Sequence, residues 1–119
     1  MRGNLGEKAR LQHILDAISE IESYTHRAGF DDFTENSMMR FASIKQLEII
    51  GESTNSLTDD FKRRFSNIEW RSIVGLRNIL VHHYFGIDEN VVWGIIQKDV
   101  PEPKMKVVEI LANLESKVV

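Results

Sequence analysis

Apolar residues recur every three or four positions along most of this chain, which is the spacing of one face of an α-helix. The first run predicts a helix over about residues 6–27, with an apolar stripe formed by Leu11, Ile14, Leu15, Ile18 and Ile21. His26 and Arg27 would complement the negative end of its dipole, and Gly29 is expected to close it in the left-handed conformation. The pattern therefore begins with one long amphipathic helix.

Two further helices are expected in the next part of the chain. Asp32 stands three residues before Glu35, which is the spacing of a capping box, and it predicts the start of a second long helix. Apolar residues at helical spacing continue that helix through residues 38–57. Thr58 is a suitable N-cap for a short helix that follows.

The second half of the chain predicts three more helices. One is expected over about residues 70–84, ending near Gly86, and Asp88 is a natural N-cap for the next. Pro101 and Pro103 are expected to separate that helix from the last one. No alternating strand pattern occurs and the connections are short. These features predict an all-α fold, an antiparallel bundle of four to five helices.

Composition narrows the class of protein. A chain of 119 residues that is 42% hydrophobic fits a single globular domain over residues 1–119. It has no cysteine, which excludes a disulfide framework, a thiolate zinc site and a redox thiol. No apolar run approaches the roughly 18 residues of a membrane span, and the N-terminus does not resemble a signal peptide. We therefore expect a cytoplasmic protein with no membrane partner.

One predicted helix concentrates the reactive side chains. At about 100° per residue, four polar residues fall on one side of it: Arg77, Asn78, His82 and Tyr84. Apolar residues occupy the opposite arc and can dock on the bundle: Ile73, Leu76, Ile79 and Leu80. Val74 and Val81 interrupt the polar arc, which suits a face covered by another chain and predicts a homodimer interface there.

The polar side of this helix fits phosphodiester cleavage. Arginine suits phosphate oxygens, and histidine can take or give a proton near neutral pH. His82 can deprotonate a ribose 2′-hydroxyl or protonate the leaving 5′-oxygen while Arg77 stabilises the phosphate charge, and neither step requires a metal or cofactor. Glu52 is a candidate for holding Arg77 in place. In the structural alternative, Arg77 pairs with Glu48 or Glu52, and His82 and Tyr84 are ordinary interface residues.

Two segments of this helix and its C-terminal continuation resemble a known family. Residues 75–78 and 80–88 closely resemble the HepT-like branch of the HEPN superfamily, with its R-x-x-x-x-H-x-Y motif. The similarity extends to residues 50–52 in the second long helix, to Trp70 before the motif and to residues 92–93 after it. The resemblance implies a HEPN-like helical bundle that works as a dimer.

The resemblance also implies an activity. HepT-like proteins are toxins of toxin–antitoxin pairs and act as metal-independent endoribonucleases on cellular RNA, with both copies of the motif lining a composite cleft between two protomers. It implies that Arg77 stabilises the scissile phosphate, that His82 is the acid–base group and that Asn78 positions RNA or the histidine. A 2′,3′-cyclic phosphate product is expected if the 2′-hydroxyl is the nucleophile.

Tyr84 has a different implied role. In this family a minimal nucleotidyltransferase antitoxin, called MntA, modifies the motif tyrosine with AMP and silences the toxin. Tyr84 lies seven residues from Arg77, nearly above it on a helix, so an attached phosphate would place negative charge where RNA phosphate must bind. We expect the adduct to pair with Arg77.

The chain has a net charge of −3, but the charge is unevenly distributed, and the segment that contains the motif is basic enough to favour an RNA partner. Residues 62–84 hold five basic residues and one acidic residue. Lys62, Arg63 and Arg64 are expected either to extend the RNA-binding surface or to form an ordinary solvated face. The competing functional hypothesis is a non-catalytic helical module that binds a minimal nucleotidyltransferase.

Overall fold

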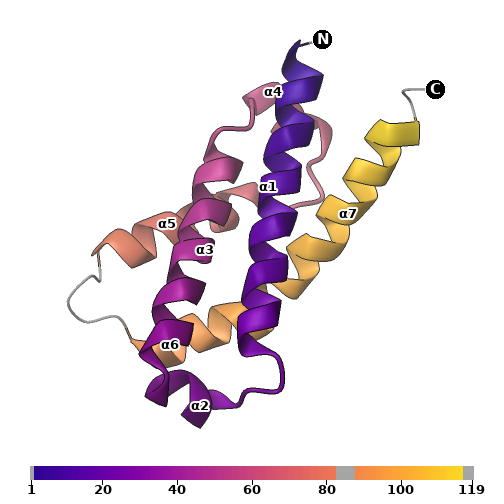
Figure 1. Cartoon of the computed structure of the whole chain (residues 1–119). Coiled ribbons are helices and arrows are strands. Elements are labelled where there is room, and N and C mark those ends of the chain that lie inside the picture. The colour runs from indigo at the N-terminus through magenta and orange to yellow at the C-terminus, as the bar shows by residue number, and fades with distance from the viewer. Residues whose placement is uncertain (1, 83–87, 117–119) are drawn as a thin grey trace.

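The computed structural model describes the backbone of residues 2–82 and 88–116 and the side chains of residues 6–77 and 88–114. Within these ranges every regular element is a helix, which confirms the predicted all-α fold (Figure 1). The elements are α1 (Arg2–Thr25), α2 (Phe30–Glu35), α3 (Ser37–Asn55), α4 (Asp59–Arg64), α5 (Trp70–His82), α6 (Glu89–Gly94), the π-helix η1 (Ile95–Asp99) and α7 (Pro101–Ser116).

The long helices do not all run along one axis. α1 and α3 lie side by side in opposite directions, and α7 packs against α1 (Figure 1). α5 instead runs across α3, and its C-terminal end projects beyond the other helices. The antiparallel arrangement expected from the sequence therefore describes α1 and α3 but not α5.

The predicted apolar stripe of the first helix lies in the core. Leu11, Ile14, Ile18 and Ile21 are at most 2% exposed, and Leu15 is half-buried beside them. They meet fully buried side chains from the other helices, among them Phe33, Leu47, Val92 and Val107. Burying such a side chain stabilises the folded state by about 1.5–3 kcal/mol. This core therefore holds α3 in place between α1 and α5, the two long helices it packs against.

Both tryptophans pack against the core, as the sequence suggests. Trp70 is buried at the start of α5, and its Nε1 donates to the carbonyl oxygens of Lys62 at 3.1 Å and Phe65 at 2.9 Å. Trp93 is half-buried, with its ring 5.1 Å from that of Phe33. The buried indole of Trp70 satisfies its own N–H and ties the start of α5 to the end of α4.

The end of α1 differs from the prediction. The helix stops at Thr25, and the left-handed residue after it is Arg27, with φ 61°, not Gly29. Gly29 has an extended backbone and is the N-cap of α2. The chain needs two changes of direction here, one to leave α1 and one to enter α2, and the glycine serves the second.

The capping of the second long helix was also assigned to the wrong residue. Asp32 lies inside the short helix α2, where its Oδ2 accepts a hydrogen bond from the Gly29 N–H at 2.8 Å. The N-cap of α3 is Asn36, whose Oδ1 accepts from the Met39 N–H at 3.0 Å. Asp32 is thus the acidic member of a capping box that begins at Gly29, and not the first residue of one.

Other expected helix starts agree with the structure. Thr58 caps α4, and Asp88 caps α6 by accepting from the Asn90 N–H at 2.8 Å. Pro101 and Pro103 do not separate two helices, because both lie in the first turn of α7. Proline is tolerated there, since the first N–H groups of a helix have no partner within it. The π-helix η1 carries the chain from α6 towards α7.

Candidate functional site

α3 and α5 cross at a glycine. A Cβ added to Gly51 would lie 3.0 Å from both the Cβ and the backbone N of Arg77 and 3.4 Å from the carbonyl oxygen of Val74. Carbon atoms in good contact are about 3.5–4.0 Å apart. The missing side chain at Gly51 therefore allows the two backbones to approach at the point where α5 carries Arg77.

Arg77 leaves this crossing with part of its guanidinium facing outward. Its Nη1 donates to Oε1 of Glu52 at 3.3 Å, and the side chain is 31% exposed. Its Nε is buried and has no hydrogen-bond partner among the described residues. Glu52 is 63% exposed, so the ion pair contributes about 0–1 kcal/mol to stability. Its main effect is to orient a group with five N–H donors, most of which remain available to an anion.

The structure thus brings Arg77 and Glu52 together, whereas Glu48 lies elsewhere and pairs with Lys45 at 3.5 Å. His82 is the last described residue of α5. The side chains of Asn78 and His82, and the whole of Tyr84, lie outside the described residues.

The predicted basic cluster lies at the other end of α5. Arg63 forms an ion pair with Asp60, and the guanidinium of Arg64 stacks over the Phe65 ring at 5.2 Å. Lys62 is half-buried. Because α4 packs against the start of α5, this cluster is about 18 Å along the helix axis from His82. It is therefore not part of the same local group as Arg77 and Glu52.

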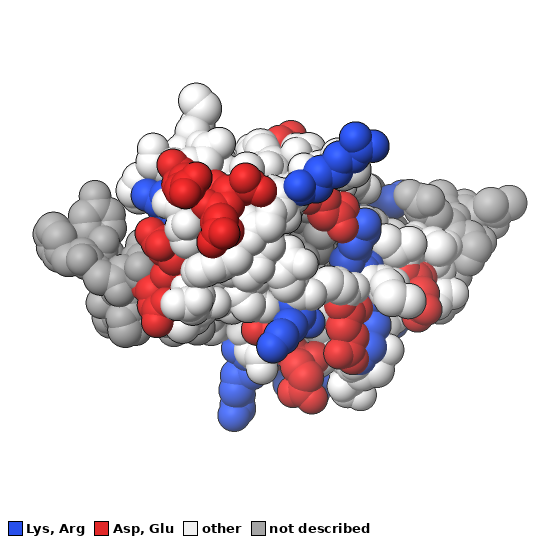
Figure 2. Space-filling view, turned by 90° about the horizontal axis from the view of Figure 1, so that it is seen from below, with Lys and Arg blue, Asp and Glu red and all other residues white. Residues whose placement is uncertain are grey.

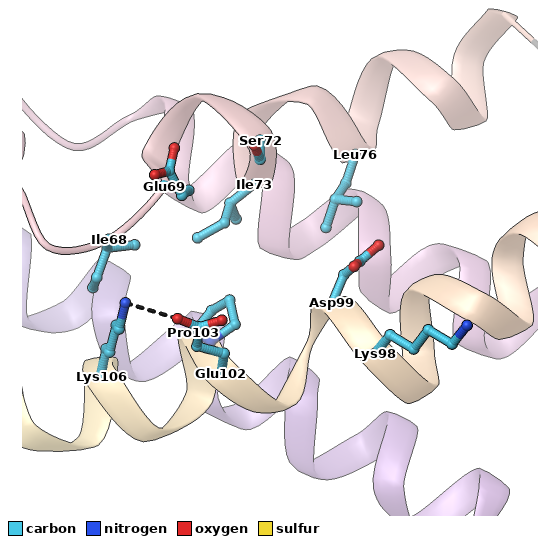
Figure 3. A pocket seen from close by; sticks show the side chains of 10 residues that line it. All are labelled: Ile68, Glu69, Ser72, Ile73, Leu76, Lys98, Asp99, Glu102, Pro103 and Lys106. Atoms are coloured by element: carbon cyan, nitrogen blue, oxygen red, sulfur yellow. Dashed lines mark ion pairs between the residues drawn. The ribbon is translucent and has the colours of Figure 1, made fainter.

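A cavity of about 320 Å³ lies on the opposite side of α5 (Figure 3). Ile73 and Leu76 line it from α5, and Pro103 faces them from α7. Lys106 closes one end and pairs with Glu102 at 3.0 Å. None of the residues that line it is one of the predicted site residues. Among the described residues, Arg77 and Glu52 are partly exposed and do not belong to this cavity.

The charged surface at the α2 and α6 end is unsuited to RNA. Figure 2 views the molecule from below and shows acidic side chains gathered over part of this end. α2 contributes Asp31, Asp32 and Glu35, all of them exposed. A phosphate backbone is repelled by such a surface, which favours the α5 face as the place for an anionic ligand.

The described residues lack two other kinds of feature. They contain no group of three or more histidine and carboxylate side chains arranged to hold a metal ion. None of the described helices has the length and apolar character needed to cross a bilayer.

The sequence matches the family described as Ribonuclease HepT-like over residues 14–110, a range that includes Glu52, Arg77 and His82. The chain belongs to the HepT-like family of the HEPN superfamily. The resemblance inferred from the motif is confirmed, and membership of this family supports ribonuclease activity.

Curated HepT-like relatives have similar names. "Putative RNase MJ1380" of Methanocaldococcus jannaschii is 44% identical over 100 residues, covering 84% of this chain and 92% of the relative. "Probable ribonuclease HepT" of Thermococcus cleftensis is 40% identical, covering 83% of this chain and 90% of the relative. The chain also spans 49% of the longer "Gamma-glutamylcyclotransferase and putative RNase MJ0434" of M. jannaschii, at 35% identity and 91% coverage of this chain. No solved structure matched.

Sequence reasoning missed one residue that builds this HepT-like site. Gly51 was noted only as part of a similar segment, although its position decides where α3 and α5 cross. A signal was present, because a glycine inside a long apolar helix pattern lowers helix stability and needs a packing reason. The partner helix was not identifiable from that signal alone.

Proposed function

We propose that this chain is a metal-independent endoribonuclease and the toxin of a toxin–antitoxin pair. The observation that carries the proposal is the placement of Arg77. The guanidinium is held at the α3–α5 crossing by Glu52, is 31% exposed, and belongs to a residue five positions before His82 in a member of the HepT-like family. In this proposal Arg77 supplies the phosphate-binding group and His82 supplies the group that transfers protons.

The proposed reaction consumes no water and needs no metal ion. The 2′-oxygen of a ribose attacks the adjacent phosphorus, the bond from phosphorus to the 5′-oxygen breaks, and the products are a 2′,3′-cyclic phosphate and a 5′-hydroxyl. The 2′-hydroxyl loses a proton and the leaving 5′-oxygen gains one; His82 carries out one of these two transfers, and the other is exchanged with solvent, which is not consumed. Arg77 stabilises the charge on the non-bridging oxygens, and Asn78 positions RNA or the histidine.

A dimer completes this site in the proposal. On one helix, position 82 lies about 7.5 Å along the axis from position 77 and about 140° around it, so the two positions lie on different parts of the helix surface. Two copies of α5 facing each other bring an Arg77 and a His82 towards one cleft. The projection of the C-terminal end of α5 beyond the rest of the bundle supports this contact (Figure 1).

The test is RNA cleavage by the purified chain in the presence of a chelator. The parent is expected to convert single-stranded RNA into fragments with a 2′,3′-cyclic phosphate end, identified by mass spectrometry. His82→Ala is expected to lower the rate by about 10²- to 10⁴-fold, because it removes the acid–base group. Arg77→Ala should also lower the rate strongly, since it removes the phosphate-binding charge.

His13→Ala is the matched control, because His13 is an exposed histidine on α1. It should cleave RNA as the parent does. Equal cleavage by all four proteins would overturn the assignment. A parent that neither cleaves RNA nor harms cells when expressed without an antitoxin would instead indicate the non-catalytic module that binds a nucleotidyltransferase.

A further inference from the structure

The outward face of α5 carries a cation that the fold does not use. Arg71 is exposed on the first turns of the helix. It makes no ion pair or side-chain hydrogen bond with any other residue that the structure describes. Arg63 and Arg64, by contrast, are engaged by Asp60 and by the Phe65 ring. Arg71 is therefore a cation of α5 with no described partner, about 16 Å along the helix axis from position 82.

Gly75 lies one turn further along the same face. A Cβ added there would have no described atom within 4 Å, so none of the described residues requires a glycine at this position. Gly51 is the opposite case, because a Cβ there would meet Arg77 at 3.0 Å. A glycine inside a helix lowers its stability relative to alanine, and glycine is used where a backbone must come close to a ligand. The open space at Gly75 thus calls for a partner from outside the chain.

The spacing joins these two positions to the motif. Positions 71, 75, 78 and 82 follow one another at intervals of four, three and four, which places them along one side of a helix. Arg71 and Gly75 lead along this side from the start of α5 to the proposed catalytic end. A ligand that reaches positions 78 and 82 and is longer than one nucleotide has this path open to it.

We propose that Arg71 and Gly75 form a track for the RNA backbone beside the cleavage site. Arg71 binds a phosphate a short distance along the strand from the scissile one, and the bare helix surface at Gly75 lets the strand lie close to α5. RNA is favoured over a second protein chain as the occupant because the face presents an unpaired guanidinium, which suits a phosphate. This inference rests on the proposed ribonuclease function and adds the path that the RNA strand follows along α5.

The contribution of Arg71 is tested by the salt dependence of binding. The probe is a single-stranded 2′-O-methyl oligoribonucleotide, which cannot be cleaved through its 2′-oxygen. Arg71→Ala should weaken binding and reduce the slope of log affinity against log salt by about 0.7, because one phosphate contact is lost. The control is Lys98→Ala, which removes an exposed charge on η1 and should leave the slope unchanged.

Gly75 is tested by comparing two alanine variants. Gly75→Ala and Gly94→Ala both add a methyl group to a helix at a position where a Cβ meets no described atom within 4 Å. Each should raise the midpoint of thermal unfolding by roughly 2 to 5 °C. Only Gly75→Ala should also lower the efficiency of RNA cleavage, by about 10-fold or more, because the strand is held away from the catalytic groups.

Failure of this track can be distinguished from failure of the ribonuclease assignment. If the parent cleaves RNA but Arg71→Ala keeps the parental salt slope, the track is wrong and the enzyme remains. If Gly75→Ala lowers the unfolding midpoint, or changes the sedimenting mass while oligonucleotide affinity is unchanged, the glycine serves packing or a protein partner and the track is overturned. A parent that neither cleaves RNA nor binds the oligonucleotide overturns both proposals.

Discussion

Arg77 has two chemically different surroundings. Its stem lies against the backbone crossing at Gly51, and its Nη1 is held by Glu52, while the rest of the guanidinium is not engaged by described residues. A side chain that is already oriented at its stem and at one terminal nitrogen loses little conformational freedom when a phosphate binds. It is equally ready for any other phosphate placed within its reach.

The proposed silencing of the toxin follows from that property. We expect an AMP group on Tyr84 to place its phosphate against Arg77 and to exclude RNA. Coexpression with a minimal nucleotidyltransferase partner should therefore add the mass of AMP to the chain and abolish its RNA cleavage.

Tyr84→Phe should escape this modification and remain active when coexpressed. Tyr24→Phe is the control, since Tyr24 is the other tyrosine of the chain and lies on α1; that variant should still be modified and silenced. Modified protein that cleaves RNA at the parental rate would contradict the blocking mechanism.

At the scale of elements, the decisive feature is the crossing of α3 and α5. α5 is placed by two contacts that are far apart in the sequence: Trp70 donates to carbonyl groups around the end of α4, and Gly51 admits the backbone at Arg77. Together they set both the position of α5 along α3 and the side that it presents. A change in either contact moves the motif without altering any motif residue.

Gly51→Ala should therefore weaken the fold and the activity together. Its new Cβ would lie 3.0 Å from the backbone N of Arg77, and the helices must separate to accept it. Overpacking of this kind costs about 1–3 kcal/mol, which chemical denaturation measures as a lower midpoint. RNA cleavage should fall as well, because Arg77 moves with the displaced helix and catalysis depends on the exact position of such a group.

Gly94→Ala again serves as the control for adding a methyl group to a helical glycine, because its Cβ has open space. A Gly51→Ala protein with parental stability and activity would show that α5 adjusts to the crossing without consequence.

The sequence predicts the elements better than their junctions. The apolar stripe of α1 and the caps at Thr58 and Asp88 agree with the structure, because each depends on residues within one helix. The turn at Arg27 and the start of α3 at Asn36 were missed, since they depend on how α1, α2 and α3 pack. Residue type and spacing alone favour Gly29 as the residue that ends the first helix and Asp32 as the cap of the next long helix.

The candidate site divides in the same way. Arg77 and Glu52 were named from the motif and from its similarity to a family, and the structure places them 3.3 Å apart. The sequence also allowed Glu48 as the partner, because both glutamates lie on the same helix and only the crossing point separates the alternatives. The proposed roles of Arg71 and Gly75 could not be predicted from the sequence. They depend on the structure, in which Arg71 has no described ion-pair partner and a Cβ at Gly75 would meet no described atom within 4 Å.

At the scale of the whole molecule, Arg77 and Glu52 are partly exposed and lie apart from the cavity. The cavity of about 320 Å³ lies on the other side of α5 and contains none of the predicted site residues in its lining. A single chain therefore offers RNA one side of a helix, whereas enzymes usually enclose their substrates in clefts. The proposed second copy supplies the missing wall of the cleft.

Cleavage should consequently depend on protein concentration. Below the dissociation constant of the dimer, the rate per chain should fall in proportion to dilution, because the fraction of chains in dimers falls. Initial rates over a dilution series, compared with the mass measured by sedimentation, test this expectation. A constant rate per chain in samples that sediment only as monomers would contradict the composite cleft.

The glycine at the helix crossing has a consequence for genetics. A selection for cells that survive expression of the proposed toxin collects every substitution that inactivates it while the protein is still made. Because Gly51 sets the position of Arg77 by contact with its backbone, substitutions at codon 51 should be recovered beside those at codons 77 and 82. A position that never touches RNA would then be as sensitive to mutation as the residues that do.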